Sequence, residues 1–306
     1  EISNEDKIIT YLQNRLLKNN EVTDEYLKLA IKDSFKRLIY PSIEREIRSE
    51  LTDKGEEGAI LIFKENLKAL LMQAPIKGKV VMGYDPGFRT GCKVAVLDPT
   101  GKFLEKATVY PTVPKKDIEG TKKLLKELIY KHNVDVISLG NGTASRESEE
   151  VISEMLTEIK NESGKELAYV IVSEAGASVY SASELAAKEY PDLDVTIRGA
   201  ISIGRRLQDP MAELVKIDPK AIGVGQYQHD VTPKRLDESL TGVVEDSVNK
   251  VGVDLNTATP SLLTYIAGIN AYIANNIVAY RDETGGFKSR KEVISYLKKN
   301  KRATYL

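Results

Sequence analysis

The sequence contains few cysteines and histidines, the residues that form disulfides and bind metals in small secreted proteins. It contains one cysteine, Cys92, and two histidines among 306 residues. A single cysteine cannot form an internal disulfide, so a disulfide-stapled secreted fold is excluded and a reducing cytoplasm is the expected compartment. Two histidines and one cysteine also provide too few soft ligands for a structural zinc site.

The sequence also lacks an excess of charge of either sign and any long apolar run. Forty-four Lys and Arg residues face forty-five Asp and Glu residues, which gives a net charge of −1. This balance excludes a uniformly basic coat protein for nucleic acid, so any polyanion site must be a local patch. No apolar stretch approaches the roughly 18–20 residues that span a bilayer, and we expect neither a signal peptide nor a membrane partner.

The first 77 residues are predicted to be helical throughout. Apolar residues recur there at helical spacing, and Thr23 before Asp24 is typical of an N-cap followed by an acidic first turn. Pro41 is expected to break the pattern and to start another helix, and a last helix is expected around Ala59–Met72. A helix-turn-helix would share this pattern, but the even mixture of charges favours a fragment of a helical bundle.

Residues 78–215 predict a different architecture, an α/β layer. Three apolar or alternating runs come first, at 79–84, 93–97 and 103–110, and the turn at 98–101 joins the last two. Helical and strand patterns then alternate, at 117–132, 134–139, 145–159 and 168–172. An antiparallel meander followed by helices and parallel strands is the order of the ribonuclease-H-like fold, a mixed sheet covered by helices.

Three carboxylates occupy positions where a nuclease of this fold would hold a divalent metal. Asp85 ends the first strand, Glu174 follows the last strand, and Asp209 lies beyond it, with Glu213 as a candidate fourth ligand. Two-metal phosphoryl transfer needs three or four carboxylates from different elements, and the ion would be Mg²⁺ or Mn²⁺. Simpler interpretations are that residues 85–87 form only a hairpin turn and that Asp209 caps a helix. Because the set is thin, we expect a degenerate site for which no cofactor is required.

Two glycine-bearing loops carry candidate phosphate contacts. The stretch GYDPGFRTG contains Arg89, and the stretch GNGTASR brings Arg146 to the start of a helix. Glycines let the backbone approach a phosphate closely, and a helix N-terminus offers N–H groups to an anion. A simpler role for the second loop is structural, with Thr143 or Ser145 capping the helix.

Residues 216–306 are predicted to form a helical linker and a helix-hairpin-helix region. From residue 255 onward the chain has eight Lys and Arg against three Asp and Glu, a net charge of +5. Two apolar helical stretches meet at Gly268-Ile269-Asn270, and such hairpins bind backbone phosphates without reading sequence. An ordinary helical hairpin would look the same, but four basic residues favour nucleic acid: Arg281, Lys288, Arg290 and Lys291. The nearby tyrosines are interpreted as packing residues: Tyr265, Tyr272 and Tyr280.

Several long stretches resemble the Tex family of bacterial transcription accessory proteins. They cover most of residues 80–292 and include GYDPGFRTGCKVAVLD, SEAGASVYSASELAAKEYPDLDV, RGAISIGRRLQDPMAELVKIDPKAIGVGQYQHDV and NNIVAYRDETGGFKSRKE. The resemblance implies a YqgF-type ribonuclease-H-like domain, related to the RuvC resolvases, beside a helix-hairpin-helix module. It also implies nucleic-acid binding and similarity to a eukaryotic elongation factor that travels with RNA polymerase.

The resemblance assigns roles to particular carboxylates. It places Asp85 on the first catalytic aspartate of the resolvase-like nucleases and Glu174 on their strand-end glutamate. Asp209 lies near the third carboxylate, but the paired acids of the last helix are not evident, and the domain is generally regarded as a degenerate or unproven nuclease. Family members normally end in a second hairpin and an OB-fold RNA-binding domain, which the end of these 306 residues does not match, so we expect reduced nucleic-acid affinity.

Three functions follow, in order of preference. The first is a cytoplasmic nucleic-acid-binding scaffold in transcription, for RNA or DNA with little sequence specificity and with RNA polymerase as a candidate partner. The second is a nuclease or resolvase whose Mg²⁺ or Mn²⁺ is held by Asp85, Glu174 and Asp209. The third, an ATPase of the actin or sugar-kinase plan, is disfavoured because the GNGTAS loop has no aspartate. The sequence indicates no role for the loop Gly223–Asp230, which contains His229, and no oligomeric state.

Overall fold

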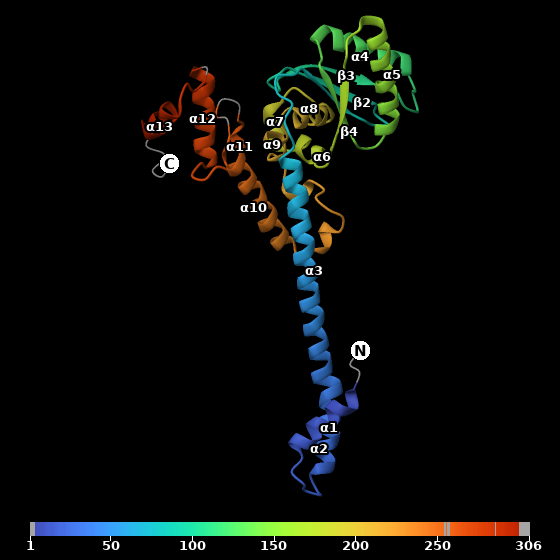
Figure 1. Ribbon diagram of the computed structural model, residues 1–306, viewed down its shortest axis with the longest axis vertical. Helices are drawn as coiled ribbons and strands as arrows, with labels where there is room; N and C mark the ends of the chain where they lie inside the picture. Colours follow the sequence, from blue (N-terminus) through green and yellow to red (C-terminus); the bar gives the residue numbers. More distant parts are fainter. Residues whose placement is uncertain (1–3, 254, 256–257, 285, 300–306) are drawn as a thin grey trace. The chain divides into compact units, whose positions relative to one another are not determined.

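The computed structural model describes residues 4–253, 255, 258–284 and 286–299, without the side chains of residues 282, 290 and 297–299 (Figure 1). The chain forms two compact units, Glu1–Leu61 and Ile62–Leu306. The boundary between them lies inside helix α3 (Tyr40–Leu71), earlier in the chain than the change of sequence pattern after residue 77.

The first unit is helical, as predicted. It contains α1 (Glu5–Leu16), α2 (Asp24–Ser34), a π-helical turn (Phe35–Ile39) and the first part of α3. Thr23 holds the N-cap position of α2, but its side chain makes no capping hydrogen bond. The predicted N-cap position and the acidic first turn are thus confirmed. The capping bond is absent because the backbone of Thr23 is already helical, and the side chain of Asn20 accepts from the amide of Val22.

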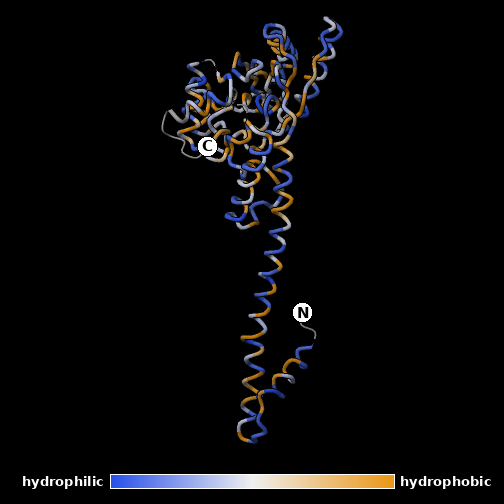
Figure 2. Tube along the Cα trace, turned by 60° about the vertical axis from the view of Figure 1, so that its left-hand side comes forward, coloured by the Kyte–Doolittle hydropathy of each residue, from blue (hydrophilic) through white to orange (hydrophobic). Residues whose placement is uncertain are grey.

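Pro41 does not break the helix, contrary to expectation, and no separate helix begins near Ala59. The π-helical turn lies directly before α3, and the amide of Tyr40 donates to the carbonyl of Phe35, five residues earlier. This longer hydrogen-bond register accommodates the N–H that proline lacks, so the chain continues as one helix of 32 residues. Figure 2 shows apolar and polar residues interleaved along α3.

The second unit is built on a five-stranded mixed sheet in the order β3-β2-β1-β4-β5. Its strands are β1 (Val81–Asp85), β2 (Cys92–Leu97), β3 (Phe103–Val109), β4 (Val136–Gly140) and β5 (Ala168–Val172). The first three strands pair antiparallel as a meander, and β4 and β5 extend the sheet from β1 in parallel. This topology confirms the predicted ribonuclease-H-like fold.

Helices cover both faces of the sheet. On one face α4 (Ile118–His132) and α5 (Ser145–Ser163) share a core with the strands, and on the other α8 (Val195–Gln208) packs on Ala95 and Leu97. A glycine allows α8 to approach β1 closely, because a Cβ atom on Gly83 would lie 2.1 Å from the carbonyl oxygen of Ala200. The close approach at Gly83 thereby fixes the position of β1 against α8.

Further helices complete the second unit. They are α6 (Ala177–Ser181), α7 (Glu184–Glu189), α9 (Pro210–Leu214), α10 (Pro233–Val251), α11 (Pro260–Leu263), α12 (Ala271–Thr284), α13 (Arg290–Lys299) and two 3₁₀ turns, Pro219–Ala221 and Gln228–Asp230. Acceptor residues before proline cap three of these elements, as is typical of such pairs: Asp209, Asp218 and Thr259. Among the residues described, no helix combines the length and apolar character that crossing a membrane requires.

Candidate carboxylate site and nucleic-acid interface

Asp85 and Glu174 lie together at the carboxyl end of the parallel strands. Asp85 is the last residue of β1, and Glu174 follows β5 by two residues. Burial and, after it, the negative charge of Glu174 together raise the pKa of Asp85 to about 7, against the opposing effect of the ammonium of Lys93. The structure therefore brings two of the three predicted carboxylates into one electrostatic site.

The loop after β4 is folded around Glu174. The amide of Glu174 donates to Oδ1 of Asn141 over 3.1 Å, and the amide of Gly142 hydrogen-bonds the Glu174 carboxylate, which lowers its pKa against the larger effect of burial. A Cβ atom on Gly142 would lie 1.6 Å from Oε1 of Glu174, so any larger residue there would displace the Glu174 carboxylate from its present position. The GNGTAS loop is thus built to hold a carboxylate.

The predicted cap of α5 is wrong. The N-cap position belongs to Ala144, whose backbone is left-handed with a φ of 69°, and no side chain caps the helix. Thr143 lies in the turn before the cap position, and Ser145 is already the first residue of the helix. Arg146 is exposed in the first turn, where it stays a candidate phosphate contact.

The loop between β1 and β2 is longer than a tight hairpin and has its own internal bonds. The amide of Gly87 lies 3.5 Å from Sγ of the buried Cys92, and Nζ of Lys93 donates to the carbonyl of Gly91 over 3.0 Å. Asp85 is paired with Lys93 across the antiparallel ladder. The segment therefore joins the two strands and also positions the carboxylate of Asp85. Arg89, in the same loop, is exposed.

The third predicted carboxylate does not join this pair. Oδ1 of Asp209 accepts from the amide of Ala212 over 3.0 Å, as the N-cap of α9. Glu213 is buried and its carboxylate lies 2.9 Å from Nζ of Lys216. Across the described residues, no group of three or more His, Cys, Asp or Glu is arranged to hold a metal ion. The structure thus groups Asp85 with Glu174, and it gives Asp209 the alternative role of a helix cap.

Two residues of α8 face the carboxylate pair, and the sequence reasoning missed both. A Cβ atom on Gly199 would lie 2.9 Å from Oδ2 of Asp85. Arg206, two turns further along the same face, is 3% exposed. Burial raises the pKa of Glu174, and the charge of Arg206 offsets only part of that rise, while burial lowers the pKa of Arg206 itself. The seven-residue spacing of Gly199 and Arg206 on an otherwise apolar helix face could have indicated that both are buried.

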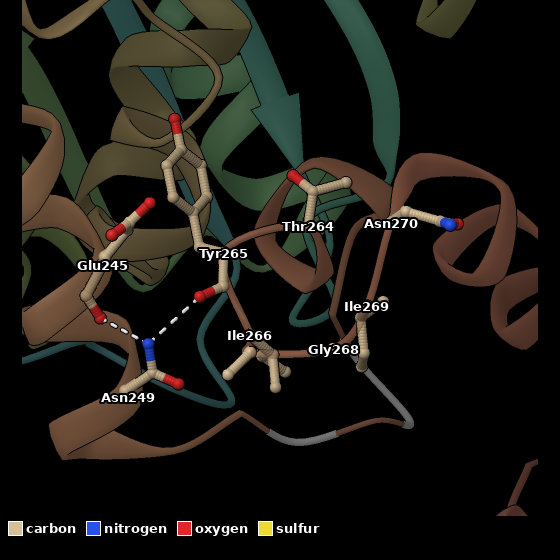
Figure 3. Close-up of a pocket in the computed structure, with 9 residues that line it drawn as sticks. Glu245, Asn249, Thr264, Tyr265, Ile266, Gly268, Ile269 and Asn270 are labelled. Carbon is tan, nitrogen blue, oxygen red and sulfur yellow. Dashed lines mark hydrogen bonds between the residues drawn. The ribbon is translucent and has the colours of Figure 1, made fainter. Parts of the chain in front are cut away.

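The predicted hairpin is present between α11 and α12. Gly268 has a φ of +85°, a left-handed conformation that favours glycine, and the amide of Ile269 donates to the carbonyl of Ile266 over 3.0 Å. Oδ1 of Asn270 accepts from the amide of Ile273 over 2.9 Å and caps α12. Figure 3 shows the turn at Gly268 beside Asn249, which joins α10 to the hairpin through the carbonyl of Tyr265.

The backbone of this turn is open to ligands. Ala267, Gly268 and Asn270 are exposed, and together with Asn249 and Tyr265 they line a pocket at the hairpin. Within the described part of the chain, the amides of Ala267 and Gly268 donate no hydrogen bond. Amide donors without an internal acceptor, at a turn followed by a helix N-terminus, suit an anionic ligand.

The basic residues near the hairpin differ in their availability. Lys288 and Lys291 are exposed, whereas Nη1 of Arg281 donates to the carbonyl of Ala258 over 2.7 Å and ties that segment to α12. The side chain of Arg290 lies outside the described residues. The ring of Tyr280 lies 4.2 Å from the ring of Tyr296 and 5.2 Å from that of Phe287, which confirms its packing role.

The loop Gly223–Asp230 packs against the last turns of α3. Nδ2 of Asn66 donates to the carbonyl of Val224 over 2.7 Å, and a Cβ atom on Gly225 would clash with the ring of Phe63. The buried side chain of Gln228 bonds the amide of Val224 and thereby closes the loop on itself. His229 is exposed on the outside of the loop.

Comparison with known proteins assigns both regions. Residues 79–208 match the family model of the Tex protein YqgF-like domain, and residues 248–298 match that of the helix-hairpin-helix motif. The chain is 58% identical over 249 residues to Protein tex of Bordetella pertussis, covering 81% of this chain and 31% of that protein. The chain belongs to the Tex family. The family resemblance and its two domains, predicted from the sequence, are confirmed.

Other Tex-like relatives extend over most of the chain. The transcriptional accessory protein Tex of Neisseria gonorrhoeae is 50% identical over 270 residues, covering 88% of this chain and 35% of that protein. The human S1 RNA-binding domain-containing protein 1 is 44% identical over 286 residues, covering 92% of this chain and 28% of that protein. The chain thus spans about a third of the length of these relatives.

Proposed function

We propose that this Tex-family chain is a nucleic-acid-binding module of a transcription accessory protein. The observation that carries the proposal is the exposed turn at Gly268, whose neighbouring amides have no acceptor in the described structure. A phosphate placed at this turn would accept from those amides and benefit from the N-terminal dipole of α12. The match of residues 248–298 to the helix-hairpin-helix motif supports the same role.

The contact would be with the backbone of nucleic acid and not with its bases. Amide donors and the ammonium groups of Lys288 and Lys291 recognise phosphate, which is the same at every nucleotide. Both RNA and DNA are therefore expected to bind, with little sequence preference. The names of relatives as transcriptional accessory protein and S1 RNA-binding domain-containing protein support a place beside RNA polymerase.

The ribonuclease-H-like domain would then act as a scaffold. Metal-dependent cleavage needs three or four converging carboxylates, and the described structure brings only Asp85 and Glu174 together. The alternative, a Mg²⁺- or Mn²⁺-dependent nuclease, is favoured by that pair and by the loop that holds Glu174. Cleavage that requires Mn²⁺ and disappears in Asp85→Asn would establish the alternative.

Replacement of Gly268 by valine tests the binding proposal. Valine at a φ of +85° is strained and would move the amides out of line, so the Kd for a single-stranded or duplex oligonucleotide should rise at least tenfold. Fluorescence anisotropy at fixed salt measures the change. The matched control is Gly78→Val, which carries the same backbone strain at a φ of +72° with open space around it.

Two results would contradict the proposal. One is an unchanged Kd in Gly268→Val with the helical content preserved in circular dichroism. The other is an equal loss of binding in Gly78→Val, which would show that strain anywhere in this unit abolishes binding.

A further inference from the structure

Arg206 is buried beside Glu174 and grips the segment that carries it. Its Nη1 donates to the carbonyl of Ser173 over 2.7 Å and to that of Ala175 over 2.8 Å, the residues on either side of Glu174. The guanidinium therefore fixes the backbone on both sides of the site carboxylate.

Both side chains carry buried polar atoms that form no hydrogen bond within the described structure. Nε and Nη2 of Arg206 are buried without a hydrogen-bond partner in the described structure, and so is Oε2 of Glu174. A buried carboxylate needs a cation to offset the loss of solvation, and a guanidinium provides a permanent one. With Lys93 acting on Asp85, each site carboxylate has a cation from the chain itself.

The residues around the pair do not fit a divalent ion. Where α8 passes Asp85, the residue that faces the carboxylate is Gly199, which has no side chain to donate a ligand. A magnesium or manganese ion would meet two carboxylates and a fixed positive charge, and Coulomb repulsion between a guanidinium and a divalent cation in a buried site is strong.

We propose that Arg206 takes the place of the divalent cation in this ribonuclease-H-like domain. The guanidinium places a permanent positive charge near Glu174 and orients the turn after β5, two tasks that a bound metal would otherwise perform. The domain thereby keeps the geometry of the carboxyl strand ends without binding Mg²⁺ or Mn²⁺. The proposal is independent of nucleic-acid binding at the hairpin.

The test is a Mn²⁺ titration of the whole 306-residue chain, followed by electron paramagnetic resonance of free Mn²⁺ and by the shift of Tm. The unsubstituted protein should show no site-specific binding up to about 1 mM Mn²⁺. In Arg206→Gln the uncompensated carboxylates should bind Mn²⁺ at least tenfold more tightly, and adding Glu174→Gln should remove the gain. The matched control is Arg198→Gln on the same helix, whose Nε donates to the carbonyl of Tyr190 away from the pair.

Two results would overturn the proposal. One is submillimolar Mn²⁺ binding by the unsubstituted protein that is lost in Asp85→Asn. The other is a folded Arg206→Gln variant whose Mn²⁺ affinity matches that of Arg198→Gln. Nucleic-acid binding measured on the same samples should be unaffected, so failure at the hairpin and failure here are distinguishable.

A second variant decides the matter if Arg206→Gln does not fold. Gly199→Asp adds a third carboxylate next to Asp85 while Arg206 stays in place. If the guanidinium excludes the metal, this variant should bind Mn²⁺ no better than the unsubstituted protein. A tenfold gain in Gly199→Asp would show that only the missing ligand prevented binding, and Arg206 would lose the role proposed for it.

Discussion

The two candidate sites of the second unit treat their polar groups in opposite ways. At the strand ends, Gly142 and Arg206 lie about the carboxylate of Glu174 and Asn141 holds its backbone amide, all of them groups of the same chain. At the hairpin, the amides next to Gly268 are exposed and donate to no acceptor within the described residues. A site whose charged groups are buried and held by the same chain maintains structure, whereas a site with exposed, open donors is prepared for a ligand.

The comparison predicts first that the contact between β1 and α8, which supports the enclosed site, tolerates no added side-chain volume. In Gly83→Ala the new Cβ atom would lie 2.1 Å from the carbonyl of Ala200, so α8 must move away from β1. We expect the free energy of unfolding to fall by about 3 kcal/mol, since overpacking against backbone costs this much. The midpoint of urea denaturation measures the loss.

The control for this substitution should change stability in the opposite direction. A Cβ atom on Gly242 in α10 would meet nothing within 4 Å, so Gly242→Ala should gain about 0.5–1 kcal/mol from helix propensity. A Gly83→Ala variant as stable as Gly242→Ala would mean that α8 and β1 are not in close contact, and the enclosed character of the site would be lost.

Local sequence patterns predicted the strands, helix starts and hairpin on which both sites are built. The apolar and alternating runs correspond to β1–β5, and a proline after an acceptor residue marked three helix starts, including that at Asp209. The hairpin was predictable because a left-handed glycine between two apolar helical stretches is a local feature. Secondary structure is determined within a few residues, so such features can be read from one sequence.

Contacts between distant segments could not be read in the same way. The π-helical turn before Pro41 changes the hydrogen-bond register and keeps a helix intact that proline should end. Arg206 meets Glu174 across 32 residues of chain, and the choice of Asp209 between a metal and a helix cap depends on where α9 lies. These outcomes depend on tertiary packing, which local propensity does not contain.

A second prediction concerns the pH dependence of the enclosed site. The pKa of Asp85 is about 7 in the folded protein and 3.8 in the absence of the fold. Because the folded state holds the proton more tightly, the ionised carboxylate destabilises the protein progressively as pH rises from 4 to 7, and fully above 7. A shift of about three pKa units corresponds to about 4 kcal/mol. Because Asp85 is only partly buried, solvent screening reduces this cost, and Asp85→Asn should raise the free energy of unfolding by about 2 kcal/mol at pH 8 relative to pH 4.

Denaturation of the variant and of the unsubstituted protein at several pH values measures the difference between them. The difference should grow between pH 4 and pH 7 and then level off. A difference that does not vary with pH would indicate that Asp85 is solvated and that Glu174 and Lys93 do not act on it.

The smallest expected effect concerns the open site. Replacing Lys288 and Lys291 by alanine removes two exposed ammonium groups near the hairpin and leaves the Gly268 turn intact. The slope of log K against log salt for duplex DNA should become shallower by about 1.8, since each lost phosphate contact removes about 0.9. At physiological salt the loss of binding free energy should be about 1 kcal/mol, smaller than that of Gly268→Val, because exposed charges are screened. The control is Lys123→Ala on α4, an exposed lysine of the enclosed-site domain. A change of slope by about 0.9 in that variant, the share of one lysine, would show that general charge, and not the hairpin, attracts the nucleic acid.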